Sequence, residues 1–181
     1  MTKTTDQNEP CASDASRAGS AEDEPPQPAP GSLEITDTTE RLDARALEWL
    51  ERFGTLAINE AAGAEPGSVA LSIVDDDKMA DLHLFHSGIE GTTDVLTFDL
   101  REEESGALDV EIVVCRDEAL RQSGDGKPVE RELLLYLLHG VLHCLGFDDH
   151  DPAEFERMHA REDEILNAIG VGSVYDSGEP R

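Results

Sequence analysis

Apolar residues are missing from the first part of the chain and then recur with regular spacing. Residues 1–32 contain no Leu, Ile, Val, Phe, Trp or Tyr, and they hold five of the nine prolines. Such a segment cannot bury enough apolar surface to order itself, so we predict a disordered acidic tail over residues 1–32. From Leu33 onward, alternating runs and helical stripes of apolar residues indicate a folded domain, and we assign residues 33–181 to one domain.

The apolar pattern of that domain predicts four strands and five helices. Short runs rich in β-branched residues predict the strands SLEIT, SVALSIV, TDVLTFDL and ALDVEIVVC. A first helix is expected to start at a Thr38 or Thr39 cap, and a second is capped by Asp75. Three more are predicted at RDEALRQSG, at VERELLLYLLHGVLHCLG and from Pro152 to Ile169. Because strands and helices follow no strict βαβ rhythm, we predict an α+β fold with a small mixed β-sheet packed with helices.

The charge of the chain is strongly negative. Asp and Glu total 41 against 14 Lys and Arg, which gives a formal net charge of −27, and residues 1–32 account for only four of these charges. The folded domain is therefore acidic itself and should repel nucleic acid at low salt. A salt-rich cytosol would screen this repulsion, so a halophilic source is one hypothesis, and DNA is not an expected partner.

The cysteines and the hydropathy of the chain indicate the cellular compartment in which the protein is expected. The three cysteines show no C-x-x-C spacing, so no disulfide framework is implied. The N-terminus lacks the basic and apolar regions of a secretory signal, and no apolar run approaches the length of a membrane span. These features predict a cytoplasmic protein with no membrane association.

The stretch LHGVLHCLGFDDH carries the candidate chemistry. His139 and His143 stand four residues apart on an apolar helix and therefore project from one face. Gly146 can end this helix in the left-handed conformation, and Asp149 follows ten residues after His139. The spacing matches the zinc pattern H-E-x-x-H-x-x-G-x-x-H, except that Gly140 replaces the glutamate and Asp149 the last histidine. Without that glutamate as general base, peptide hydrolysis is disfavoured, and glycine leaves room beside the metal or lets another backbone approach.

Two blocks of the chain resemble the YbeY family of rRNA maturation endoribonucleases. HGVLHCLGFDDH is similar to that family's H-G-x-L-H-x-x-G-Y-D-H signature, and GTTDVLTFDL to its T-D-V-L-S-F segment. The resemblance extends from about Leu33 to Gly170. It implies a single α+β domain, one zinc ion (Zn2+) held by three side chains, and metal-dependent cleavage of single-stranded RNA. It also implies work on the 3′ end of 16S rRNA and on ribosome quality control, with ribosomal RNA and ribosomal particles as partners.

The chain departs from the family pattern at two places. The family's third histidine aligns with Asp149, which spacing favours as third ligand, whereas His150 is the more usual zinc donor and stays the alternative. Asp148 and Asp151 are expected to cap a helix or to support a ligand. The family's arginine aligns with Ser87, and the sequence offers four substitutes without choosing among them: His86, Lys78, Arg101 and Arg116.

Two functions follow from these residues. The first is a zinc-dependent endoribonuclease whose metal ligands are His139, His143 and Asp149, with the catalytic residues left unknown. The alternative is a non-catalytic ribosome assembly factor with a structural metal site, which the missing arginine and the negative charge favour.

Overall fold

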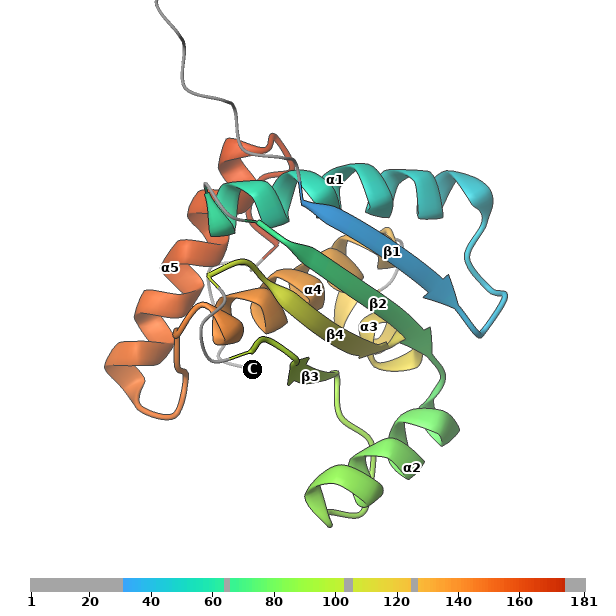
Figure 1. Ribbon diagram of the computed structural model, residues 1–181. Coiled ribbons are helices and arrows are strands. Elements are labelled where there is room, and N and C mark those ends of the chain that lie inside the picture. The colour runs from blue at the N-terminus through green and yellow to red at the C-terminus, as the bar shows by residue number, and fades with distance from the viewer. Residues whose placement is uncertain (1–30, 64–65, 103–105, 125–126, 175–181) are drawn as a thin grey trace, which may run out of the picture.

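The computed structural model describes residues 31–63, 66–102, 106–124 and 127–174. They form a single α+β domain built on a four-stranded mixed sheet (Figure 1), which confirms the predicted fold class. The strands are β1 (Ser32–Asp37), β2 (Ser68–Val74), β3 (Val95–Asp99) and β4 (Asp109–Cys115). All four predicted strands are present. The predicted disordered tail lies outside the described residues up to position 30.

The sheet has the order β1-β2-β4-β3, so β3 is an edge strand. β1, β2 and β4 run parallel, whereas β3 pairs antiparallel with β4. Parallel neighbours need a crossover, and α1 (Ala44–Ala62) supplies it between β1 and β2. On the other side of the sheet, the five residues of β3 pair with β4, and both strands contact α4 (Val129–Cys144).

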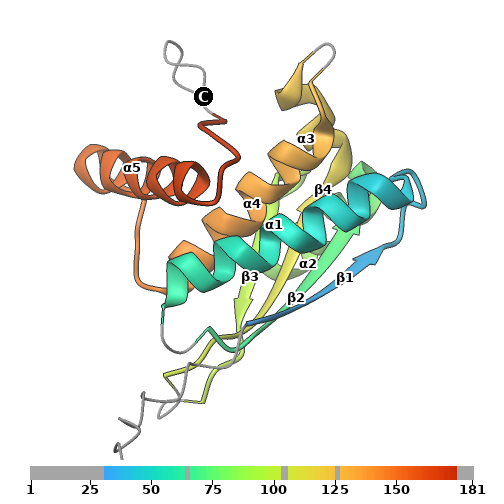
Figure 2. The ribbon, with the colours of Figure 1, turned by 90° about the horizontal axis from the view of Figure 1, so that it is seen from above.

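Helices cover the two faces of the sheet unequally. α1 and α4 (Val129–Cys144) form a layer on one face (Figure 2). α3 (Arg116–Ser123) precedes α4, and α5 (Pro152–Ala168) packs on α1 and α4. The short α2 (Asp76–Ser87) covers part of the opposite face. No helix within the described ranges is long and apolar enough to cross a membrane.

The main core lies between α4 and the helix-covered face of the sheet. Ten of the 16 residues of α4 are buried, because this helix is apolar nearly all round. Fully buried neighbours come from α1, β2 and β4: Leu50, Leu71, Ile73 and Ile112. Each such side chain contributes roughly 1.5–3 kcal/mol when removed from water. This packing fixes α4 firmly, so that the histidines on its exposed stripe have a rigid support.

One predicted helix start is wrong. Asp43, and neither Thr38 nor Thr39, caps α1, since its carboxylate accepts a hydrogen bond from the Ala46 N–H at 2.8 Å. Thr38 instead continues the strand pairing, because its N–H and hydroxyl both donate to the Ile73 carbonyl. The caps at Asp75 for α2 and Asp151 for α5 are as predicted.

Candidate metal centre

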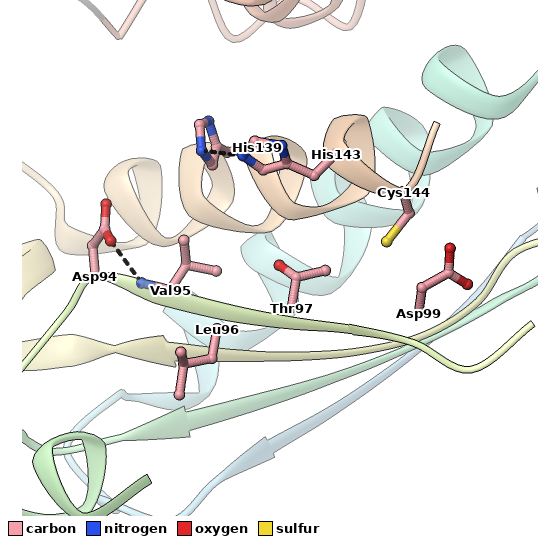
Figure 3. A pocket seen from close by; sticks show the side chains of 8 residues that line it. All are labelled: Asp94, Val95, Leu96, Thr97, Asp99, His139, His143 and Cys144. Atoms are coloured by element: carbon pink, nitrogen blue, oxygen red, sulfur yellow. Dashed lines mark hydrogen bonds between the residues drawn. The ribbon is translucent and has the colours of Figure 1, made fainter. Parts of the chain in front are cut away.

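The last turns of α4 bring two imidazole rings together. His139 and His143 are one helical turn apart, and their Nε2 atoms lie 3.0 Å from each other (Figure 3). Their side chains are 19% and 32% exposed, so both rings are half-buried but reach the surface. The predicted pairing of these side chains on one face is therefore seen in the structure.

The hydrogen bonds of the two Nδ1 atoms determine the direction of the lone pairs on the Nε2 atoms. The Nδ1 of His143 lies 3.1 Å from the Phe147 carbonyl oxygen, which can only accept, so this Nδ1 carries a proton. The Nδ1 of His139 lies 2.9 Å from Oε1 of Glu162. With both Nδ1 atoms donating, the two Nε2 atoms of neutral rings turn lone pairs toward one point. Those lone pairs repel unless a proton or a cation lies between them, and the arrangement therefore suits a metal ion.

A glycine turn carries Asp149 back to the two rings. Gly146 has φ of 89°, and the N–H of Phe147 donates to the Leu142 carbonyl, which are features of a Schellman ending. The Oδ2 atom of Asp149 then lies 3.6 Å from Nε2 of His139 and 3.9 Å from Nε2 of His143. One donor atom from each of the three residues lies within 4.8 Å of the others. Two imidazoles and one carboxylate are an accepted zinc donor set with an open fourth position.

His150 lies on the outside of the same turn. Its side chain is 85% exposed, and its Nδ1 contacts the Asp148 carboxylate rather than either ring. Asp148, Asp149 and His150 form a second group with donor atoms close together, but Asp148 and His150 are exposed. The structure thus brings Asp149 to the histidine pair and leaves the alternative ligand His150 facing solvent.

Glu162 is a residue of the site that the sequence reading missed. Its side chain is fully buried, and its two carboxylate oxygens contact Nδ1 of His139 and, at 2.7 Å, Nδ1 of His159. His159 is therefore half-buried behind the site. A signal was present, because Glu162 falls on the apolar stripe of α5 formed by Met158, Ile165 and Leu166.

Two side chains at the site, His139 and Cys144, have pKa values above their ordinary ones. Burial alone would lower the pKa of His139, but the hydrogen bond and charge of Glu162, with smaller contributions from Asp149 and Asp94, raise it. Burial raises the pKa of Cys144 to about 11. Cys144 lines the groove and also packs against the main core.

An open groove of about 500 Å³ runs between β3 and α4 beside the rings (Figure 3). It is lined by Asp94, Val95, Leu96, Thr97, Asp99, His139, His143 and Cys144. Gly140 lets the two walls approach, since a Cβ there would lie 2.6 Å from Oγ1 of Thr97 and 3.0 Å from Cδ1 of Ile112. The glycine thus makes room for sheet side chains rather than for a bulky group beside the metal.

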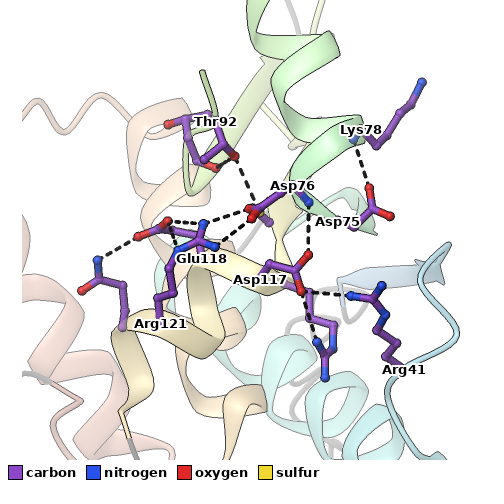
Figure 4. Close-up of polar contacts among 12 residues, drawn as sticks. Arg41, Asp75, Asp76, Lys78, Thr92, Asp117, Glu118 and Arg121 are labelled. Carbon is purple, nitrogen blue, oxygen red and sulfur yellow. Dashed lines mark hydrogen bonds and ion pairs between the residues drawn. The ribbon is translucent and has the colours of Figure 1, made fainter. Parts of the chain in front are cut away.

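The family's arginine aligns with Ser87, and the four residues that could take its place are widely separated in the structure. Lys78 and His86 line a different hollow on the opposite face of the sheet. Arg116 pairs with Asp117, which also binds Arg41 at the network shown in Figure 4. Only the fourth candidate, Arg101, contacts residues that line the groove, namely Asp99 and Cys144.

Most of the chain is similar to proteins of one known family. The family model described as "Endoribonuclease YbeY" matches residues 33–170. A protein named endoribonuclease YbeY from Macrococcus caseolyticus is 32% identical over 148 residues, which cover 77% of this chain and 96% of the relative. One of the same name from Symbiobacterium thermophilum is 35% identical over 150 residues, covering 76% and 93%. A solution structure from Thermotoga maritima, 25% identical, covers 82% of this chain and 99% of its own, with a TM-score of 0.48. The chain therefore belongs to the YbeY family.

Proposed function

We propose that this protein is a metal-dependent endoribonuclease that cuts single-stranded RNA during maturation of the 16S rRNA 3′ end. The names carried by the family and by its relatives support an RNA-cleaving role in rRNA processing. The single observation that carries the proposal is the convergence of two Nε2 atoms and one carboxylate oxygen at the wall of an open groove. We further propose ribosomal particles as partners, a part in ribosome quality control, and action in the cytoplasm, where ribosomes assemble.

The proposed cofactor is one zinc ion held by His139, His143 and Asp149. Two nitrogens and one oxygen are typical zinc donors, and the Glu162 carboxylate behind His139 is the kind of partner that orients a ligating imidazole. A cation bound there supplies positive charge where a phosphodiester becomes more negative in its transition state. Glu162 and the Phe147 carbonyl hold the two rings in place, so little reorganisation is needed on loading.

The alternative is an assembly factor that binds ribosomal particles without cutting RNA and uses the metal only for stability. The acidity of the domain favours it. The openness of the site argues against it, because structural zinc sites are closed by four protein donors. Here three donors face a groove, and among the described residues Asp94, which also lines this groove, is not part of their group of close donor atoms.

The deciding experiment is cleavage of single-stranded RNA by the zinc-loaded protein, with bound zinc measured in the same samples. We expect one zinc per chain and cleavage that disappears in a His139→Ala variant. Cleavage at the wild-type rate by that variant would remove the metal from the reaction. Zinc binding and co-sedimentation with ribosomal particles, together with no turnover of RNA, would establish the assembly-factor alternative.

A further inference from the structure

The groove beside the candidate metal centre is lined by negative charge. Asp94 and Asp99 lie at its two ends (Figure 3), and Asp149 lies beside the histidines. The C-terminal end of α4 also faces this region, and the last carbonyls of a helix carry partial negative charge. An RNA strand would bring its phosphates into the same place, so binding it requires cations near the groove.

Arg101 is a cation held at this groove. It follows the end of β3 by two positions, and its Nε lies 2.9 and 3.1 Å from the two carboxylate oxygens of Asp99. Its Nη2 donates to Asp99 and to the carbonyl oxygen of Cys144. Because Cys144 is the last residue of α4, the guanidinium bridges the end of β3 and the last turn of α4.

The guanidinium keeps the capacity to bind another anion. An arginine carries five N–H donors in a planar fork, and here Nε and Nη2 are engaged. No hydrogen bond within the described parts of the chain involves Nη1. The side chain is 23% exposed, so solvent and a ligand can reach it. The two N–H groups of Nη1 are therefore available to donate charge-assisted hydrogen bonds to a phosphate oxygen.

Arg101 offsets part of the negative charge around the groove. Asp94, Asp99, Asp149 and the buried Glu162 place four carboxylates near the site, and a divalent ion would balance two of their charges. Arg101 offsets one of the remaining two. Without it, the groove would be more negative and would repel an incoming phosphate more strongly.

We propose that Arg101 is the phosphate-binding residue of the groove and positions single-stranded RNA across the metal centre. Held by Asp99 and by the Cys144 carbonyl, its guanidinium binds a backbone phosphate close to the bond that is cut. This inference rests on the proposed function, because it takes RNA as the ligand of the groove. It assigns to Arg101 a contact with substrate backbone that carries no base specificity.

The test measures binding of a short, fluorescein-labelled single-stranded RNA by anisotropy over a series of salt concentrations. The variants are Arg101→Ala and Arg101→Lys, all zinc-loaded. The matched control is Arg41→Ala, which also loses one charge and one ion pair but lies at the network with Asp117. Arg101→Ala should bind about tenfold more weakly at low salt, as expected for one lost charge-assisted contact. Its log–log salt slope should fall by about 0.7, the value for one phosphate of a single strand.

The other variants separate charge from geometry. Arg101→Lys should keep the salt slope and lose part of the affinity, since lysine retains the charge but has no planar guanidinium that can bridge Asp99 and the Cys144 carbonyl while donating to a phosphate. Arg41→Ala should keep the wild-type slope. If Arg101→Ala binds RNA with the affinity and slope of Arg41→Ala, the proposal is overturned.

A purely structural role for Arg101, as a clamp between β3 and α4, would give a different result. The melting temperature and zinc content would then fall while the salt slope stayed at the wild-type value, and this also overturns the proposal. Should Arg101→Ala not fold, Arg101→Gln keeps a donor for the Cys144 carbonyl and is measured in its place. Binding is read without cleavage, so a wild-type protein that binds RNA but does not cut it rejects the proposed endoribonuclease and leaves the role of Arg101 intact.

Discussion

Helix α4 and the turn after it, residues 147–151, both contribute to the candidate metal centre, but they differ in how firmly their donors are held. The two rings of α4 stand on a helix buried in the core, and each is oriented through Nδ1 by a partner. In the turn, Asp148 and His150 contact mainly each other and are exposed. Both regions thus contain closely spaced side chains that could bind a metal. Only those of α4 stand on a buried helix and have partners that orient them.

Removing one donor from each region gives the largest expected contrast. His139→Ala deletes a ring that contacts Glu162 through Nδ1 and His143 through Nε2, the proposed metal-binding atom. Zinc binding and RNA cleavage should therefore fall to background. His150→Ala removes an exposed ring and should leave both close to wild type. Zinc content and cleavage rate are measured side by side. Equal losses in the two variants would show that the turn, and not the helix alone, supplies a histidine ligand.

The buried partner behind α4 offers a second contrast. Glu162→Gln keeps the size of the side chain but removes the charge that orients His139, and zinc affinity should fall by about 10- to 100-fold. The matched control is Glu164→Gln on the same helix, where the side chain is 68% exposed and pairs with Arg161. Competition with a chelator measures both affinities. Equal affinity in the two variants would mean that the contact with His139 does not support the metal.

The tight packing of α4 against the sheet is tested at Gly140. An alanine there meets Thr97 and Ile112, and we expect a loss of roughly 1–3 kcal/mol in the free energy of unfolding from overpacking. Adding Thr97→Ala removes the nearest atom and should recover part of that loss. Urea unfolding of the single and double variants checks this, and an unchanged stability in Gly140→Ala would show that the two walls separate easily.

The smallest effect is expected in the turn and depends on pH. The hydrogen bond with His150 lowers the pKa of Asp148 from its usual 3.8, and the same contact raises the pKa of His150 from its usual 6.5. The stabilisation by Asp148 is lost as pH falls through its lowered pKa, and that by His150 is lost as pH rises through its raised pKa. Their pair should therefore stabilise the fold fully only between about pH 3.8 and 6.5.

Thermal melts of the wild type and His150→Ala across this range measure the contribution of the pair. The difference should be small, greatest within that window, lower on both sides of it, and screened by salt, because both groups are exposed. A large difference at neutral or alkaline pH would mean that His150 makes a contact other than the one with Asp148.

Local sequence signals predicted the parts of the site that depend on one element. The spacing of His139 and His143 and the helix-ending glycine Gly146 required only the geometry of one helix and its end. Glu162 was missed because it reaches the site through the packing of α5 on α4, which no short motif encodes. The first helix cap was misplaced for a related reason, since pairing of Thr38 with β2 overrode its local preference as a cap.

The position of Glu162 also has a consequence for the order of assembly. The residues on the metal side of the groove span positions 139 to 162, whereas the opposite wall comes from Asp94 to Asp99, more than 40 positions before His143. Closing the shorter loop has the smaller entropic cost, and local contacts form earlier in a folding chain. We therefore expect an ion added during refolding to be captured by a partly folded segment containing α4 and α5, before the opposite wall of the groove has folded.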